Sequence, residues 1–82
     1  MKNFFYVYIL VSYANEQKHY SGFATDLEER LLRHNRGACP HTAKDRPWRI
    51  ETAIAFRSRT KAQAFERYLK TGSGREFARR HF

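Results

Sequence analysis

Arg30 and His34 are the pair of side chains whose spacing most directly suggests chemistry. Residues four apart on a helix project from the same face, so a guanidinium and an imidazole would lie side by side. A guanidinium can neutralise a phosphate, and an imidazole can take or give a proton near neutral pH. Leu27 and Leu31 repeat at the same interval and can pack while the polar pair faces a cleft. Taken alone, however, Arg30 could be a solvated helix arginine, and His34 could complement the helix dipole.

Tyr8, Tyr20 and Glu66 are the other residues whose side chains could take part in catalysis or bind a metal ion. One carboxylate can suffice for a hard cation such as Mg²⁺, which takes oxygen ligands and keeps many of its waters. A tyrosine with a pKa near 10 is only about one part in a thousand ionised at pH 7, so a tyrosine base needs cations, a metal or a proton acceptor beside it. The ordinary alternatives are tyrosines that fill a core and a Glu66–Lys70 pair at i, i+4.

Three segments predict the strands that position these groups. Residues 4–11 are eight consecutive apolar residues, rich in aromatic and β-branched types, which is typical of a central strand covered on both faces. A polar, turn-like segment follows, and residues 19–23 return as the second strand of a hairpin. A third strand is predicted at 48–56, where apolar and β-branched residues alternate: Ile50, Thr52, Ile54 and Phe56.

Helices are predicted from Ser/Thr residues followed three positions later by Glu or Gln, the capping-box spacing. The pairs are Thr25 with Glu28, Thr60 with Gln63, and Ser73 with Glu76. Gly37 and Gly72 predict the ends of the first two helices, and residues 38–47 read as a polar loop. The order β-β-α-β-α-α predicts a single α/β (α+β) domain over residues 1–82, because 82 residues cannot enclose a second hydrophobic core.

The charge of the chain indicates a polyanionic partner. Sixteen Lys and Arg against eight Asp and Glu give +8 and a pI of about 10.2, which attracts nucleic acid or an anionic membrane. The plainer alternative is a basic surface without a partner. After residue 56 the only acidic residues are Glu66 and Glu76, whereas eight residues are basic: Arg57, Arg59, Lys61, Arg67, Lys70, Arg75, Arg79 and Arg80.

The single cysteine and the short apolar run at 4–11 bear on the cellular location of the protein. Cys39 has no partner for an internal disulfide, which favours a reducing compartment. The apolar run at 4–11 is too short to span a bilayer and lacks a cleavage site for a signal peptide. We therefore expect a cytoplasmic protein without a membrane partner.

Two tripeptides and the residues after them resemble the GIY-YIG endonuclease superfamily. The tripeptides are Tyr6-Val7-Tyr8 and Tyr20-Ser21-Gly22, in which Tyr6 replaces a glycine and Val7 and Ser21 replace isoleucines. The residues that match at family spacing are Thr25-Asp26-Leu27, Arg30, His34-Asn35, Gly37, Ala62, Glu66 and Lys70. The chain is most similar to small bacterial members that consist of this domain alone, which are similar to the nuclease domain of UvrC. Phe23 departs from repair nucleases that hold a lysine at this position.

The resemblance implies a three-stranded antiparallel sheet flanked by helices and a hydrolase acting on phosphodiester bonds, with DNA favoured over RNA and with a role in DNA repair. It implies that Tyr20 is the general base, that Tyr8 orients the water and that Arg30 binds the scissile phosphate. His34 would take or relay a proton, so that the base is Tyr20 or His34. Glu66 would hold one divalent metal ion, Mg²⁺ or Mn²⁺.

The basic residues expected to track the phosphate backbone are Lys44, Arg46, Arg67, Lys70, Arg75, Arg79 and Arg80. A homodimer or a separate protein is expected to supply substrate specificity. The alternative function is a non-catalytic nucleic-acid-binding module that keeps the fold, although such a module would not need the Tyr, Arg, His and Glu set. A purely structural interaction domain would leave the charge of +8 unexplained.

Overall fold

The apolar run near the N-terminus forms the central strand of a three-stranded antiparallel sheet, as predicted. A computed structural model describes residues 3–82, so the first two residues of the predicted 1–82 domain lie outside the described residues. The strands are β1 (Phe5–Ser12), β2 (His19–Ala24) and β3 (Trp48–Phe56), in the order β2-β1-β3. Because β1 pairs on both edges and is covered on both faces, almost all of its side chains are buried.

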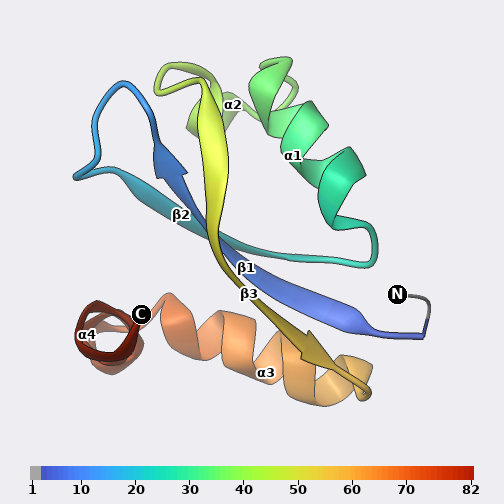
Figure 1. Cartoon of the computed structure of the whole chain (residues 1–82). Coiled ribbons are helices and arrows are strands. Elements are labelled where there is room, and N and C mark those ends of the chain that lie inside the picture. The colour runs from blue at the N-terminus through green and yellow to red at the C-terminus, as the bar shows by residue number, and fades with distance from the viewer. Residues whose placement is uncertain (1–2) are drawn as a thin grey trace.

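Helices cover both faces of this sheet. Helix α1 (Leu27–Asn35) and the short α2 (Pro40–Ala43) lie on one side, and α3 (Arg59–Leu69) and α4 (Gly72–His81) lie on the other (Figure 1). The predicted order is confirmed, except that α2 forms within the segment expected to be a loop. Proline at its first helical position has a fixed φ suited to a helix start, and the Trp48 indole N–H donates to the Thr42 carbonyl at 2.8 Å, which holds the turn in place.

The three predicted capping residues were wrong by one or two positions. The side chains that accept a hydrogen bond from the first turn are Asp26, Ser58 and Thr71, in place of Thr25, Thr60 and Ser73. Each of the three has an extended backbone, which a capping residue needs, and neighbouring residues of the same type made the sequence pattern ambiguous. Gly37 follows α1 at a φ of 81°, as predicted, whereas Gly72 starts α4 and does not end α3.

The sheet carries a hydrophobic cluster on each face. Val7 and Ile9 of β1 pack against α3, whereas Tyr8 and Leu10 pack on the side of α1, because successive strand residues point to opposite faces. A bulge in β3 breaks the predicted alternation: Ile9 lies opposite Thr52, but Leu10 lies opposite Ile50. Thr52, Ile54 and Phe56 therefore share the α3 face, and Ile50 joins the α1 face.

Helices α3 and α4 meet at a close backbone contact that only glycine permits. Gly74 is buried, and a Cβ built on it would lie 2.5 Å from the Tyr68 carbonyl carbon and 2.8 Å from the Leu69 Cα. These are backbone atoms that cannot rotate away. Gly74 therefore fixes how closely the start of α4 approaches the end of α3.

We predict that Gly74→Ala destabilises the fold by about 1–3 kcal/mol, the range for overpacking a tight site. Gly72→Ala is the matched control in the same helical turn, because a Cβ there meets no atom within 4 Å. Its effect should stay within about 0.5 kcal/mol. Urea denaturation of the two variants makes the measurement, and equal stabilities would contradict the assigned contact.

Candidate active site

A buried hydrogen bond between Tyr8 and His34 forms the centre of the candidate site. The Tyr8 hydroxyl lies 2.9 Å from His34 Nε2, joining β1 to the last turn of α1. Tyr8 is 3% exposed and His34 is 1% exposed. His34 lies in the last turn of α1, and its ring is enclosed between the sheet and the segment that follows α1.

Thr42 fixes the orientation and the tautomer of this imidazole. Its hydroxyl lies 2.8 Å from His34 Nδ1 and donates to the Cys39 carbonyl at 3.3 Å. A hydroxyl that has given its single proton to a carbonyl can only accept from the ring, so we assign the proton to Nδ1. His34 Nε2 is then unprotonated and accepts a hydrogen bond from Tyr8.

Gly22 makes room for the Tyr8 ring on the neighbouring strand. The two residues lie opposite each other in the β1–β2 register, and a Cβ at position 22 would come within 2.5 Å of the Tyr8 Cζ. Any larger residue would push the phenol off its place beside His34. The glycine of the second tripeptide is therefore explained by packing.

Arg30 lies beside Tyr8 and is anchored to the sheet edge. One guanidinium nitrogen, Nη1, donates to the Phe23 carbonyl of β2 at 2.8 Å. Its Nε is buried and has no hydrogen-bond partner among the described residues, although a carboxylate oxygen of Glu29 lies 3.9 Å away. Phe23, at the position where repair nucleases hold a lysine, packs its ring into the hydrophobic cluster on the α3 face.

Tyr20 also packs against the His34 ring. The Tyr20 and His34 rings are 5.1 Å apart at 59°, and Tyr20 is partly exposed. Within the described part of the chain its hydroxyl makes no hydrogen bond to another residue. Tyr20 therefore presents a free hydroxyl next to the enclosed Tyr8–His34 pair.

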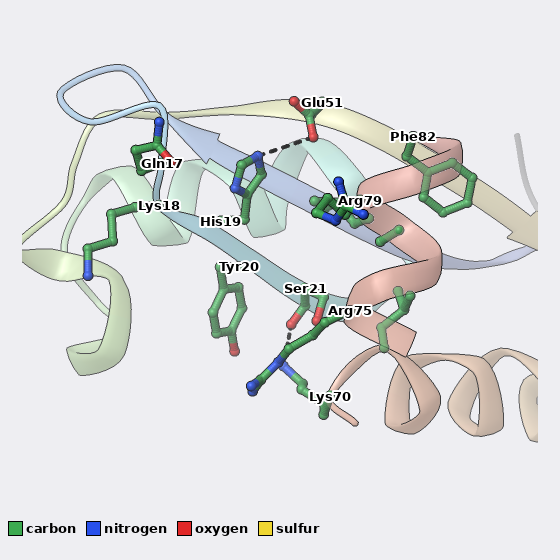
Figure 2. Close-up of a pocket in the computed structure, with 13 residues that line it drawn as sticks. Gln17, Lys18, His19, Tyr20, Ser21, Glu51, Lys70, Arg75, Arg79 and Phe82 are labelled. Atoms are coloured by element: carbon green, nitrogen blue, oxygen red, sulfur yellow. Dashed lines mark hydrogen bonds and ion pairs between the residues drawn. The ribbon is translucent and has the colours of Figure 1, made fainter. Parts of the chain in front are cut away.

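Lys70 connects this group to Glu66 on α3. Its Nζ lies 4.6 Å from the centre of the Tyr20 ring, 2.5 Å from the Ser21 carbonyl and 3.3 Å from a Glu66 carboxylate oxygen. Figure 2 shows Lys70 reaching the strand at Ser21, close to Tyr20. The structure thus brings together Tyr8, Tyr20, Arg30 and His34 directly, and joins Glu66 to them through Lys70.

Burial shifts the pKa values of Tyr8, Tyr20 and His34, and the direction differs between the tyrosines and the histidine. Burial raises the pKa of Tyr8 to about 12, although the Arg30 guanidinium opposes this shift. Burial also raises the pKa of Tyr20, with Cys39 and Glu66 adding to the effect. Burial and then the Arg30 charge lower the pKa of His34. At pH 7 both tyrosines are therefore protonated and His34 is a neutral proton acceptor.

The donor set for a metal ion is a single carboxylate. Among residues 3–82 no group of three or more His, Cys, Asp or Glu residues could hold a metal. The Glu66 side chain is 21% exposed, and only one of its two oxygens contacts Lys70. An exposed carboxylate oxygen suits a hard cation that keeps most of its waters or binds substrate oxygens, so Glu66 fits the implied role.

Only some of the predicted phosphate-binding residues lie near this group. Lys70, Arg75 and Arg79 line a groove that also includes Tyr20. Lys44, Arg46, Arg67 and Arg80 do not line it but are exposed at the surface. Arg46 donates to the Ala43 carbonyl at 2.8 Å and so supports the loop that holds Thr42.

Thr42 and Asn35 make structural contacts that the sequence did not predict. The Asn35 amide bonds both the carbonyl and the N–H of Trp48, at 3.0 and 2.6 Å, and so ties α1 to β3. Trp48 itself is 3% exposed and belongs to the core cluster that contains Tyr8 and Leu10. Thr42 lies in a polar segment without periodicity, so nothing in the sequence pattern pointed to it.

The comparison with protein families agrees with this architecture. The model of the GIY-YIG catalytic domain matches residues 4–80, and the chain belongs to this family of nuclease domains. A search of curated proteins gave no significant match. Separately, none of the helices formed by residues 3–82 is long and apolar enough to cross a membrane.

The lowered pKa of His34 predicts how stability depends on pH. Between the folded-state pKa and the unfolded value of about 6.5, the unfolded chain binds more protons than the folded chain, so stability rises with pH across this window. We expect the melting temperature to fall on acidification below about pH 6.5, and to fall less steeply in His34→Gln.

The matched control is His41→Gln, which removes an exposed histidine and should leave the wild-type pH dependence. Thermal melts of the three proteins over the same pH series make the comparison. Parallel curves for the wild type and His34→Gln would show that His34 is not held neutral by the fold.

Proposed function

We propose that the chain is a metal-dependent endonuclease that hydrolyses phosphodiester bonds in nucleic acid, with DNA as the favoured substrate. The proposal is supported above all by the Tyr8–His34 hydrogen bond, at 2.9 Å, beside Arg30. This arrangement places a neutral proton acceptor and a cation next to one partly open position, at Tyr20. A binding module would have no need of a buried, oriented imidazole.

His34 is the proton acceptor in this proposal. Its Nε2 already accepts from the Tyr8 hydroxyl, and its Nδ1 proton is held by Thr42. When the attacking water passes its proton to the Tyr8 oxygen, the Tyr8 proton moves to Nε2 and the imidazole becomes positively charged. The two tyrosines thereby exchange the roles that the family resemblance implies, because only Tyr8 is bonded to His34 and burial raises the pKa of Tyr20. Tyr20 orients the water through its free hydroxyl.

Arg30 stabilises the negative charge that develops on the phosphate. Its anchoring at the Phe23 carbonyl holds the guanidinium in place before substrate binds, so little reorganisation is needed in the transition state. The Arg30 side chain is 31% exposed, so the part of the guanidinium that is not engaged by Phe23 can meet a phosphate oxygen.

Glu66 would hold one divalent metal ion, Mg²⁺ or Mn²⁺. When bound, such an ion supplies Lewis-acid stabilisation of the phosphate and of the leaving oxygen. Lys70 keeps the carboxylate in position by its contacts to Glu66 and Ser21. The carboxylate thus lies close enough to Tyr20 to contribute to the raised pKa of its hydroxyl.

The exposed basic residues bind the phosphate backbone without reading sequence. They are Lys44, Arg46, Arg67, Lys70, Arg75, Arg79 and Arg80.

We further propose a single domain whose substrate choice comes from a homodimer or a separate protein. A cytoplasmic location and a role in DNA repair complete the proposal, the former supported by the single free Cys39.

Glu66→Gln tests the metal dependence. We expect the single-turnover cleavage rate of labelled DNA in Mg²⁺ or Mn²⁺ to fall at least about hundredfold, because metal stabilisation of the transition state is worth several kcal/mol. DNA affinity and folding should change little, since an i, i+4 pair contributes only about 0.3–0.5 kcal/mol.

Glu16→Gln is the control, because it also removes an exposed acidic residue paired with a basic one, Arg49, and neither residue belongs to the site or to the proposed phosphate-binding set. It should cleave at the wild-type rate. Wild-type cleavage by Glu66→Gln would exclude Glu66 as the metal ligand. If the wild type binds DNA but does not cleave it in either metal, the alternative of a non-catalytic binding module is correct.

A further inference from the structure

A groove of about 600 Å³ adjoins the candidate site, between the hairpin, β2 and α4. Tyr20, Ser21 and Lys70 belong both to this groove and to the cluster described above. Figure 2 shows the groove with β2 on one side and α4 on the other, and with Arg79 and Phe82 at the helix. A ligand held at Tyr20 can therefore continue directly into the groove.

The charged groups around the groove are mainly basic. Lys18 of the hairpin, Lys70, and Arg75 and Arg79 of α4 line it. Glu51 supplies the one acidic side chain among the described lining residues, and its carboxylate lies 3.4 Å from His19 Nε2. The pair between Arg79 and Glu76 is exposed on both sides, so a phosphate can compete for the guanidinium at little cost. Such a surface attracts the backbone of a nucleic acid.

The groove also offers apolar and aromatic contacts. Ile9, Leu69 and Ala78 contribute its apolar lining. Phe82 lines it as well, and is 43% exposed. The Phe82 ring packs edge-on against Phe77, with the ring centres 5.6 Å apart. An exposed ring beside basic side chains is the arrangement that stacks a base while cations bind its phosphates.

We propose that this groove binds single-stranded nucleic acid that extends from the scissile phosphate. The proposal rests on the nuclease function proposed above and names the form of its substrate. The volume falls within the range of pockets for small ligands, so it has room for roughly one or two nucleotides. Within a duplex each internal base is covered on both faces by its neighbours, so it could not present a face to Phe82. The preferred substrate therefore carries a single-stranded segment next to the cleaved bond.

Equilibrium binding in EDTA tests this proposal without cleavage. A short blunt DNA duplex and the same duplex with an oligothymidine tail are labelled, and their affinities are measured by fluorescence anisotropy. We expect the tail to tighten wild-type binding by about fivefold or more, the effect of stacking one base. Phe82→Ala and Arg75→Gln should each lose most of that gain.

Two matched variants control for loss of an aromatic ring and of a charge. Tyr13→Ala removes a ring that is 59% exposed and lies outside the groove, and Arg57→Gln removes an exposed arginine that does not line it. Both should keep the tail-dependent gain. Equal wild-type affinity for the blunt and tailed duplexes would overturn the proposal, as would an undiminished gain in Phe82→Ala and Arg75→Gln.

Photocrosslinking of the wild-type protein gives a second readout, which does not depend on whether a variant folds. A 4-thiothymidine in the tail should crosslink to the peptides containing residues 17–21 and 69–82, which line the groove. Crosslinks elsewhere would contradict the assignment. Because neither experiment needs hydrolysis, tail-dependent binding by a protein that does not cleave would reject only the nuclease function. Cleavage without tail dependence would reject only the groove.

Discussion

The hydrogen bond between Tyr8 and His34 is the contact on which the candidate site depends. It joins the central strand to α1 inside the protein, and every neighbouring feature supports it. Gly22 leaves space for the phenol, and Thr42 holds the far side of the imidazole. Because burial disfavours a charged ring, the same enclosure keeps His34 neutral and able to accept a proton.

The edge strand β2 organises the charged part of the site. One side of an edge strand has backbone groups that no neighbouring strand satisfies, and here Arg30 and Lys70 donate to carbonyls of alternate residues, Phe23 and Ser21. The two cations approach from helices on opposite faces of the sheet. The strand edge thus holds together the Arg30 guanidinium and the lysine that contacts Glu66.

Most of the fold followed from local patterns, because the apolar run of β1, the alternation in β3 and the helix-ending Gly37 act within a few residues. The errors arose where several residues satisfied one pattern, as with Thr25 beside Asp26, or where a bulge moved Ile50 to the other face. The i, i+4 spacing brought Arg30 and His34 to one face. The sequence could not reveal that Thr42 orients the imidazole, because that contact depends on how the loop after α1 folds back.

The pH dependence of cleavage tests the central claim most directly. Single-turnover rates in saturating Mg²⁺ are measured across pH for the wild type, Tyr8→Phe and His34→Gln. If His34 accepts the proton through Tyr8, the wild-type rate falls on the acid side as the imidazole is protonated, and both variants are slower by about 10²–10⁴. His34→Gln should also lose the acid limb of the profile. A wild-type acid limb retained in His34→Gln would contradict the account.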